Sequence, residues 1–400
     1  MTDALKKNPL KHETLKTRPL RKKALKKKIG AYDDNTIQPS RLRSLLKNMI
    51  DIYSPHGKET EIADFLYHYL KKHGLPVIRQ QVEEDRENIL VIPAIEEPQL
   101  VLLGHVDTVP APDFDNYKYN VTSHDRDTIS GLGSADMKGG CAAMIEAYIQ
   151  HWHQCPTPPP AALALVVGEE ESGDGTSTFL SEYTFPYAIV GEPTNLNPCF
   201  SHYGYIEANI STRGKGIHAS LAPAGVNAIE VMMHQLLKIM EYLKNHRPEV
   251  IYNIRNLSSS HKGFVVPEYC EVWIDFHVPP HSAIGDIIYE LEELFVNEGQ
   301  AKTDFNATIH FTYIHSGYEL PEKGKFYDTL HTIYQKDNLP FEPSSFRSHS
   351  DANLLWAAGV RPILIGPGQL EVSHMPDEFV SFRQVLQATH IYSRILQSLE

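Results

Sequence analysis

The chain has 400 residues, of which 42% are hydrophobic and 22% are charged, so it is long enough to form two globular domains. No apolar run approaches the ~20 residues of a membrane span, and the N-terminus lacks the apolar segment of a signal peptide. We therefore expect a cytoplasmic protein without a membrane partner. Its four cysteines form no CxxC pair, so a metal site would use histidines and carboxylates.

The N-terminal segment differs in charge from the rest of the chain. Residues 1–28 hold 11 Lys/Arg against Asp3 and Glu13, whereas the whole chain has a net charge of −13. Leucines recur there every five residues, a period that matches neither a helix stripe nor a strand. We predict a basic disordered tail over residues 1–36. Nucleic-acid or membrane-surface binding by this tail is the less favoured alternative, and we expect no nucleic-acid partner.

Residues 37–204 alternate helices with short apolar strands. A first helix is expected to start at Ser40 as N-cap, and a second over residues 60–73 is expected to end at Gly74. Apolar runs indicate strands at 76–82, 88–95, 99–106, 161–168 and 187–191. This alternation predicts an α/β domain with a mixed sheet flanked by helices.

The pattern changes over residues 205–316. Strands at 205–213, 250–257, 269–278 and 307–314, with helices at 225–246 and 283–296, give the order βαββαβ of a two-layer, ferredoxin-like α+β unit. After residue 316 the helix and strand signals seen over residues 37–204 resume, with a last helix from Ser381. We predict that residues 37–204 and 317–400 form one domain into which residues 205–316 are inserted.

Several polar side chains follow the predicted strands of the first domain. His105 ends one strand, and Asp107, two residues later, can face its imidazole and hold its tautomer. Asp136 lies in the glycine-rich stretch SGLGSADMKGG, and Glu192 and His374 follow other strands. Ligands of open α/β sheets bind at this edge, and two histidines with carboxylates suit a pair of divalent ions.

The stretch LALVVGEEESGDGT, residues 163–176, adds three adjacent glutamates. Two carboxylates about 4 Å apart repel by roughly 4 kcal/mol at an effective dielectric near 20. Cations between the acids would remove this repulsion. We interpret one glutamate as a metal ligand, its neighbour as a general base and the third as a surface residue. A solvated acidic turn is the alternative.

Six segments together resemble a known family: GHVDTVP, GSADMKGG, GEEESGDGT, GEPTNL, GKGIHASLAPAGVNAI and GPG…SHMPDEF. They are similar to segments of the co-catalytic zinc amidohydrolases and exopeptidases, which include acetylornithine deacetylase, succinyl-diaminopimelate desuccinylase, aminoacylase and glutamate carboxypeptidase. The resemblance covers residues 40–400. It implies a zinc-exopeptidase-like fold, an inserted dimerisation domain, a homodimer and two Zn²⁺ ions, with Co²⁺ as a substitute.

The resemblance also implies roles for individual residues. Glu169 would be the general base and Glu170 a ligand, although a shift of the pattern by one residue would assign Glu170 and Glu171 instead. Asp136 would bridge the two ions, and His218 would reach across a dimer to the carbonyl oxygen of the substrate. Which ion Glu192 serves stays open. The implied metal ligands are His105, Asp136, Glu170, Glu192 and His374.

Two positions depart from the family pattern. Phe264 stands where the family often has Asn, and His277 where it often has Arg, which implies an altered pocket for acidic groups. Arg347, with Asp351 in the same FRSHSDA segment, is a candidate for substrate binding, and a surface arginine is the alternative.

The leading hypothesis for function is a dinuclear zinc hydrolase that removes an N-acyl group from a small amino acid. Deacetylation of N-acetylornithine, in arginine biosynthesis, is the favoured reaction. Desuccinylation of diaminopimelate, a lysine-pathway deacylase, and a dipeptidase or carboxypeptidase are alternatives. A homologue that binds metal or ligand without turnover is the non-enzymatic alternative.

Overall fold

A computed structural model describes residues 37–95, 98–111, 117–122, 124–260, 263–296 and 306–399. The tail predicted over residues 1–36 lies outside the described residues. Within the described ranges, no helix combines the length and the apolar character that crossing a membrane requires.

The first two helices pack their apolar stripes into the core. Helix α1 (Pro39–Asp51) starts at Pro39 with Gln38 at the cap position, so the expected cap at Ser40 is wrong. The fixed φ of proline suits the first helical position, which explains the earlier start. Helix α2 (Thr60–Lys72) ends as predicted, since Gly74 follows with φ of +77°.

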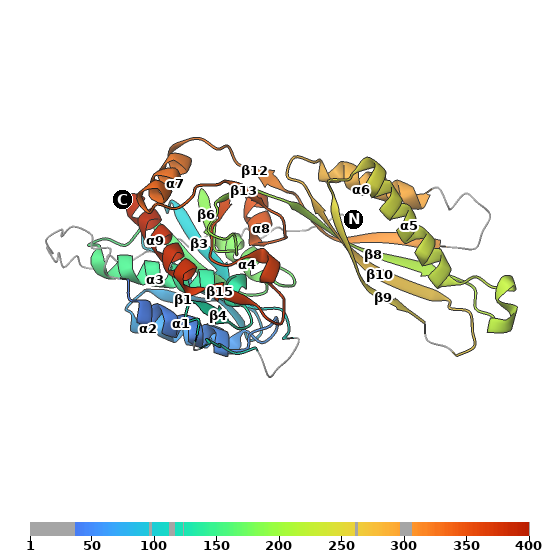
Figure 1. Cartoon of the computed structure of the whole chain (residues 1–400), viewed down its shortest axis with the longest axis horizontal. Helices are drawn as coiled ribbons and strands as arrows, with labels where there is room; N and C mark the ends of the chain where they lie inside the picture. The colour runs from blue at the N-terminus through green and yellow to red at the C-terminus, as the bar shows by residue number, and fades with distance from the viewer. Residues whose placement is uncertain are drawn as a thin grey trace, which may run out of the picture. The chain divides into compact units, whose positions relative to one another are not determined.

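A large mixed sheet forms the centre of the first part of the fold (Figure 1). Strands β3, β5, β6 and β14 run parallel to one another, so their carboxyl ends meet at one edge. β1 and β2 form an antiparallel hairpin beside them. The order across the sheet is β1 (Val77–Glu83), β2 (Arg86–Val91), β5 (Ala161–Val166), β3 (Leu100–His105), β6 (Tyr187–Val190), β14 (Arg361–Leu364), β7 (Cys199–His202) and β12 (Tyr318–Glu319), with β13 (Ser344–Phe346) paired to β7.

Helices flank this sheet. α3 (Gly139–Gln154) and α9 (Phe382–Ser398) lie side by side, and α1 and α7 (Lys325–Lys336) contact them (Figure 1). Ser381 caps α9 by accepting a hydrogen bond from the Gln384 amide, so the predicted start of the last helix is confirmed. α4 (Asp174–Glu182) and α8 (Asp351–Ala357) pack on each other and on the sheet, and β4 (Thr128–Ser130) pairs with β15 (Phe379–Ser381).

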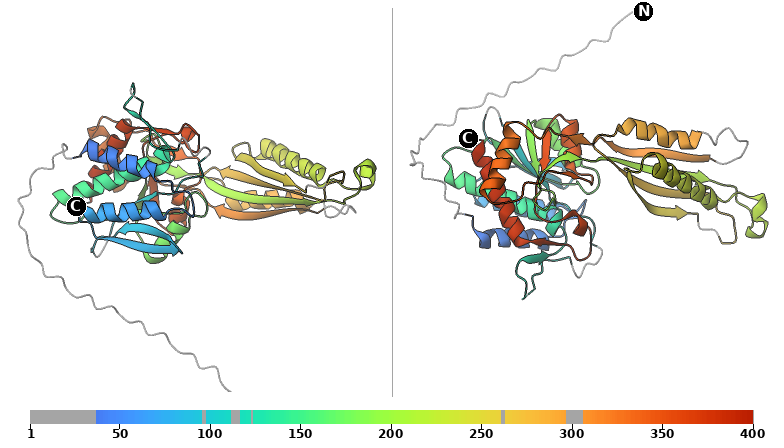
Figure 2. Two further views of the ribbon diagram at one scale, coloured as in Figure 1. Left: turned by 90° about the horizontal axis from the view of Figure 1, so that it is seen from below. Right: turned by 45° about the horizontal axis from the view of Figure 1, so that its top comes forward.

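A second sheet has the predicted βαββαβ order. Its strands lie in the order β11 (Asn306–His315), β8 (Gly204–Arg213), β10 (Tyr269–Val278) and β9 (Ile251–Ser259), all antiparallel. Helices α5 (Ala228–His246) and α6 (Ile284–Val296) lie on the same face of it (Figure 2). There they cover an apolar core of their own.

The predicted fold class is therefore confirmed, as a mixed α/β sheet with helices plus a separate four-stranded α+β unit. All the described residues belong to one compact unit, so the proposed domain boundaries after residues 204 and 316 stay a prediction.

Candidate metal centre

The predicted ligands meet at the carboxyl edge of the parallel strands. His105 is the last residue of β3, and Glu192 is the second residue after the end of β6. Glu169 and Glu170 follow β5 after a turn at Gly168, whose φ of +80° and closeness to Asp174 exclude a larger side chain. The edge thus brings together His105 and Glu192, which are 87 positions apart in the chain (192 − 105), because β3 and β6 are parallel neighbours.

A first group of ligand atoms surrounds His105. Its Nε2 lies 3.2 Å from Asp136 Oδ1 and 3.9 Å from Glu192 Oε1. The three ligand atoms all lie within 4.8 Å of one another, and all three residues are buried. Asp136 is held in a short turn between β4 and α3, and a cis peptide bond joins it to Met137.

A second group surrounds His374. Its Nε2 lies 3.0 Å from Glu170 Oε2 and 3.5 Å from Asp136 Oδ2. Asp136 therefore belongs to both groups, one oxygen facing each histidine, which is the arrangement expected of a bridging carboxylate. His374 adopts φ of +63°, a backbone conformation that is uncommon outside glycine and is often found at functional sites.

The three adjacent glutamates differ in environment. Glu170 pairs with His374, whereas Glu169 Oε2 lies 3.8 Å from His105 Nε2. Glu171 is turned outward, with 65% of its side chain exposed and His56 as its ion-pair partner at 3.6 Å. A further group, formed by His105, Glu169 and Glu170, also has ligand spacing. This geometry supports Glu170 rather than Glu171 as the residue beside His374.

The charges of the centre fit divalent cations. Burial raises the pKa of Glu169 and of Glu192 well above the usual range of a glutamate. Burial opposes protonation of His105, but its carboxylate neighbours raise its pKa well above the usual value. Glu192 Oε1 is buried and has no hydrogen-bond partner among the described residues. In the part of the chain that the structure describes, these acids pair with His105 and His374 and not with a Lys or Arg. Such dense packing of acids calls for cations, and two His with carboxylates are ligands that Zn²⁺ accepts.

A buried carboxylate outside the ligand groups supports the turn that carries Asp136. Glu378 accepts hydrogen bonds from the backbone amides of Gly133, Ala135 and Asp136 at 2.8, 2.8 and 3.0 Å, and so fixes the turn that carries Asp136. Glu378 lies in the quoted SHMPDEF segment, but its role was missed, since three amide donors leave no mark in the sequence.

Asp107 lies beside His105, although not in the predicted manner. β3 ends at His105, so the alternation of a strand does not reach Asp107. Its backbone carbonyl lies 3.1 Å from His105 Nδ1, whereas its carboxylate is 3.6 Å away, beyond a hydrogen bond. The carboxylate instead accepts the Glu170 amide at 3.0 Å. Asp107 therefore links the segments of two ligands.

The centre opens into a cavity of about 510 Å³. Asp136, Glu169, Glu170, Glu192 and His374 line one side of it. The opposite side carries residues that sequence reasoning did not single out, except for His277: Tyr205, Glu207, Arg255, Asp275, His277, Tyr313, His315 and His349. Polar residues at alternate positions of YIEANISTR and YCEVWIDFHV were the available signal for this wall.

Two histidines connect this wall to Glu169. His349 Nδ1 lies 3.7 Å from Glu169 Oε1, and its Nε2 lies 2.8 Å from Nδ1 of His315. Burial, with the neighbouring histidines, lowers the pKa of His349 to about 3. His349 is therefore neutral near Glu169 at ordinary pH.

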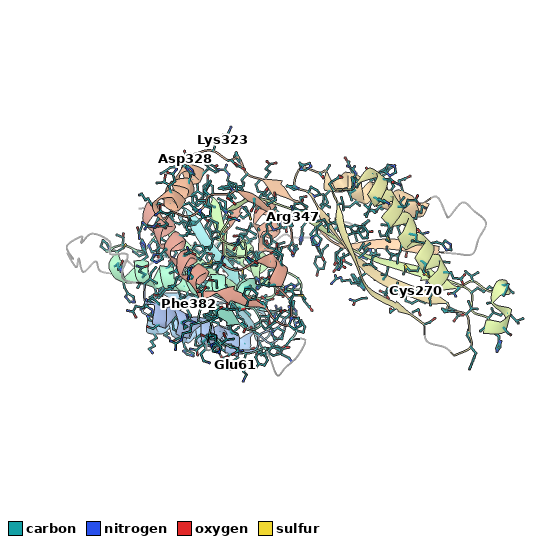
Figure 3. The ribbon with its side chains drawn as sticks, in the orientation of Figure 1. Glu61, Cys270, Lys323, Asp328, Arg347 and Phe382 are labelled. Carbon is teal, nitrogen blue, oxygen red and sulfur yellow. The ribbon has the colours of Figure 1, made fainter. Side chains whose placement is uncertain are left out.

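Four other residues singled out in the sequence belong to none of the ligand groups. His218 is exposed and its Nδ1 contacts Ser220 Oγ at 2.8 Å. Phe264, 84% exposed, neighbours it, because the Ala219 amide donates to the Phe264 carbonyl. Arg347 is exposed (Figure 3) and lines a separate hollow with Asn195 rather than the metal cavity. Asp351 is buried at the start of α8 and does not line the cavity, and burial raises its pKa to about 7.

Comparisons with known proteins agree with this geometry. The chain is 30% identical to an acetylornithine deacetylase of Vibrio cholerae over 361 residues, which are 85% of this chain and 92% of that protein. A probable carboxypeptidase of Aspergillus niger is 26% identical over 391 residues, 92% of each chain. The crystal structure of a tripeptidase from Staphylococcus aureus superposes with a TM-score of 0.76 at 20% identity, covering 91% of this chain and 99% of that one.

The model of one family, described as peptidase family M20/M25/M40, matches residues 101–398. That match spans most of the chain and includes every candidate ligand named above. The chain therefore belongs to peptidase family M20/M25/M40, and is a metal-dependent hydrolase of linear amides with a buried His/Asp/Glu centre.

Proposed function

We propose that the protein removes the acyl group from an N-acylated small amino acid, with Nα-acetylornithine as the favoured substrate and arginine biosynthesis as its setting. The observation that carries this proposal is that two ligand groups share Asp136 at the wall of a cavity. Glu169 lies beside these two groups and belongs to neither of them. The acetylornithine deacetylase relative matches 92% of its own length, which supports this substrate over others.

Two divalent ions are part of the proposal. His105 and Glu192 would hold one, Glu170 and His374 the other, and Asp136 would contribute an oxygen to each. Zn²⁺ is the proposed metal and Co²⁺ a substitute. Such ions, when bound, polarise a carbonyl and lower the pKa of water.

Glu169 is the proposed general base. It is 9% exposed and faces the cavity, and its carboxylate belongs to neither of the two groups that share Asp136. Glu169 would take a proton from the attacking water and return it to the nitrogen of the leaving amine, which breaks the amide C–N bond. His349, which is neutral, lies 3.7 Å from this carboxylate.

We also propose a homodimer in which His218 serves the partner's site. Large apolar side chains are exposed on the four-stranded unit, including Met233 (55%) and Leu237 (60%) on α5, and Tyr289 (62%) on α6. Met233 and Leu237 are neighbours one helical turn apart on α5, and contiguous exposed apolar groups mark protein interfaces. A His218→Ala chain mixed with a Glu169→Gln chain is then expected to recover about one quarter of wild-type activity, because half the dimers contain one intact site. Co-purified heterodimers no more active than either parent would contradict this role.

A peptidase of short peptides is the second candidate. The carboxypeptidase and tripeptidase relatives favour it, although at 26% and 20% identity. Purified protein with Zn²⁺ or Co²⁺ is therefore assayed on Nα-acetylornithine, succinyl-diaminopimelate and a panel of di- and tripeptides. Release of acetate from acetylornithine at the highest kcat/KM supports the proposal. Higher kcat/KM on peptides would replace it with a peptidase, and no turnover of any substrate would favour a silent homologue.

A further inference from the structure

The wall of the cavity opposite the metal ligands is built on the four-stranded sheet. Alternate residues of its strands point to the two faces, so Ile206, Ile274 and Phe276 enter the core under α5 and α6. The residues between them point away from the helices and line the cavity: Tyr205, Glu207, Asp275 and His277.

Two of these residues are carboxylates with one cation between them. Glu207 and Asp275 are 9% and 8% exposed. Arg255, from β9, contacts Glu207 through Nη2 and lies 2.9 Å from Asp275 Oδ1 through Nε. Among the described residues that line the cavity, Arg255 is the only lysine or arginine. Its guanidinium is shared by two carboxylates, so this part of the wall has an excess of one negative charge.

His277 adds a third acceptor to the wall. One of its ring nitrogens bonds to the backbone of Arg347, and burial lowers the pKa of the ring, so His277 is neutral. Its Nδ1 is buried and has no hydrogen-bond partner among the described residues. A neutral ring that donates through one nitrogen accepts through the other. Nδ1 is therefore an unused acceptor two residues from Asp275 on the same face of β10.

We propose that this wall binds a positively charged group on the amino-acid part of the substrate, and that Glu207, Asp275 and His277 thereby select acyl amino acids with a cationic side chain. The inference rests on the proposed function, whose substrate it narrows. An ammonium group offers three donors and a positive charge, which match three acceptors and the excess negative charge. The excess negative charge of Glu207 and Asp275 repels a carboxylate on the substrate side chain, so acidic side chains are disfavoured.

The test compares substrates of similar length and different charge. Nα-acetylornithine is compared with Nα-acetylcitrulline, Nα-acetylnorvaline and Nα-acetylglutamate by kcat/KM. A charge-assisted hydrogen bond predicts a preference of about 10- to 100-fold for the cationic side chain over the neutral ones. Glu207→Gln and Asp275→Asn, singly and together, are expected to reduce the ratio of kcat/KM for acetylornithine over acetylnorvaline.

A matched control lies on the same strand. Glu271 occupies the same face of β10 four residues before Asp275, and accepts hydrogen bonds from Asn209 and Tyr269 at 2.6 and 2.9 Å. It does not line the cavity. Glu271→Gln removes the same charge from the same sheet and is expected to keep the wild-type ratio. An equal fall in the ratio for this variant would assign the effect to general charge and overturn the proposal.

A binding measurement separates this inference from the proposed function. Calorimetric titration of the metal-loaded protein with ornithine, citrulline and norvaline reports on the wall without turnover. Tighter binding of ornithine that Glu207→Gln and Asp275→Asn abolish supports the inference even if acetylornithine is not hydrolysed. Equal binding of the three amino acids overturns it even if acetylornithine is a substrate. Arg255→Met could instead weaken the binding of all three amino acids equally, while the acid variants keep the wild-type order of affinities. That result would overturn the inference and assign the wall to binding the α-carboxylate of the amino acid.

Discussion

Two acidic clusters in this protein, each with a buried carboxylate at its centre, differ in what balances their charge. In the first, Arg86, only 4% exposed, donates to Glu59 Oε1 at 3.0 and 2.9 Å, to Asp174 Oδ1 at 3.1 Å and to Glu83 Oε2 at 3.3 Å. In the second, the ion-pair partners of the carboxylates around Asp136 are His105 and His374, with no Lys or Arg beside them within the described ranges. The guanidinium of the first cluster completes an internal ion network, whereas the second is incomplete without cations.

This difference separates structural acids from site acids. Burial raises the pKa of Glu59 in the first cluster, and Arg86 opposes that effect. In the second cluster, burial raises the pKa of Glu169 and Glu192 well above the usual range, and the neighbouring acids add to it. Perturbed carboxylates at a cavity wall mark a functional site, whereas a buried acid paired with an arginine, as Glu59 is with Arg86, supports the fold.

The largest expected effect separates base from ligand inside the second cluster. Glu169→Gln keeps the size of the side chain but cannot accept a proton, so kcat should fall by about 10²- to 10⁴-fold. Metal content, measured by elemental analysis, should stay at the wild-type level. Glu171→Gln is the control, because that side chain is 65% exposed and belongs to none of the ligand groups, so kcat should stay close to the wild-type value. Loss of turnover in the Glu171 variant with an active Glu169 variant would shift the assigned pattern by one residue.

The next effect tests the first cluster. Arg86→Met leaves Glu59 buried without its partner and should lower the free energy of unfolding by about 3–5 kcal/mol. Urea unfolding of metal-free protein measures it. Arg79→Met is the matched control, since Arg79 pairs with Asp64 and Glu87 near the surface, and exposed ion pairs contribute about 0.2–1 kcal/mol. Equal losses in both variants would show that burial does not distinguish these networks.

Local sequence was sufficient to predict the strand ends and to place His105 and Glu192 at one edge of the sheet. His105 and Glu192 each follow an apolar run, and parallel strands bring such positions to one edge. The capping box of α8, in which Ser350 and Asn353 exchange hydrogen bonds with each other's backbone, was also a readable signal that was missed. These features depend on neighbours in sequence.

The supporting contacts could not be predicted because they join distant segments. Glu378 binds the Gly133 amide across 245 positions, and a carboxylate with three amide donors has no motif. Arg255 meets Glu207 only because β9 and β8 flank β10 in the sheet. Asp107 was expected to hold His105 by its carboxylate, but β3 ends too early, and the carbonyl takes that position.

Burial also shifts the pKa of a histidine outside the metal centre. His202 is fully buried on β7, with Nδ1 2.7 Å from the Tyr203 carbonyl and Nε2 2.8 Å from Ser350 Oγ. Burial lowers its pKa to about 4, below the value near 6.5 of an unfolded chain. Between these values the unfolded chain binds a proton that the folded protein does not. Stability is therefore complete above pH ~6.5 and is lost as the pH falls toward 4.

A pH series measures this contribution. His202 should account for about 2 kcal/mol of the unfolding free energy lost between pH 7 and pH 5. His202→Asn should lose that much less than the wild type over the same interval, whatever its stability at pH 7. His234→Asn, at an exposed position on α5, is the control and should follow the wild-type slope. Parallel slopes for the wild type and His202→Asn would contradict the assignment.

The smallest effect concerns the link between the two ligand segments. Asp107→Asn keeps an oxygen that can accept the hydrogen bond of the Glu170 amide, and it keeps the backbone carbonyl that lies 3.1 Å from His105 Nδ1. The substitution removes the buried negative charge, which lies 3.6 Å from His105 Nδ1. Residues that support a ligand change metal affinity by about 10- to 100-fold, and the retained contacts place this variant near the lower limit. Competition for Zn²⁺ or Co²⁺ with a chromophoric chelator measures the affinity. Asp64→Asn, which removes a surface charge paired with Arg79, should match the wild type. Wild-type affinity in Asp107→Asn would mean that the carbonyl alone orients His105, whereas a loss far above 100-fold would make Asp107 part of the metal-binding group itself.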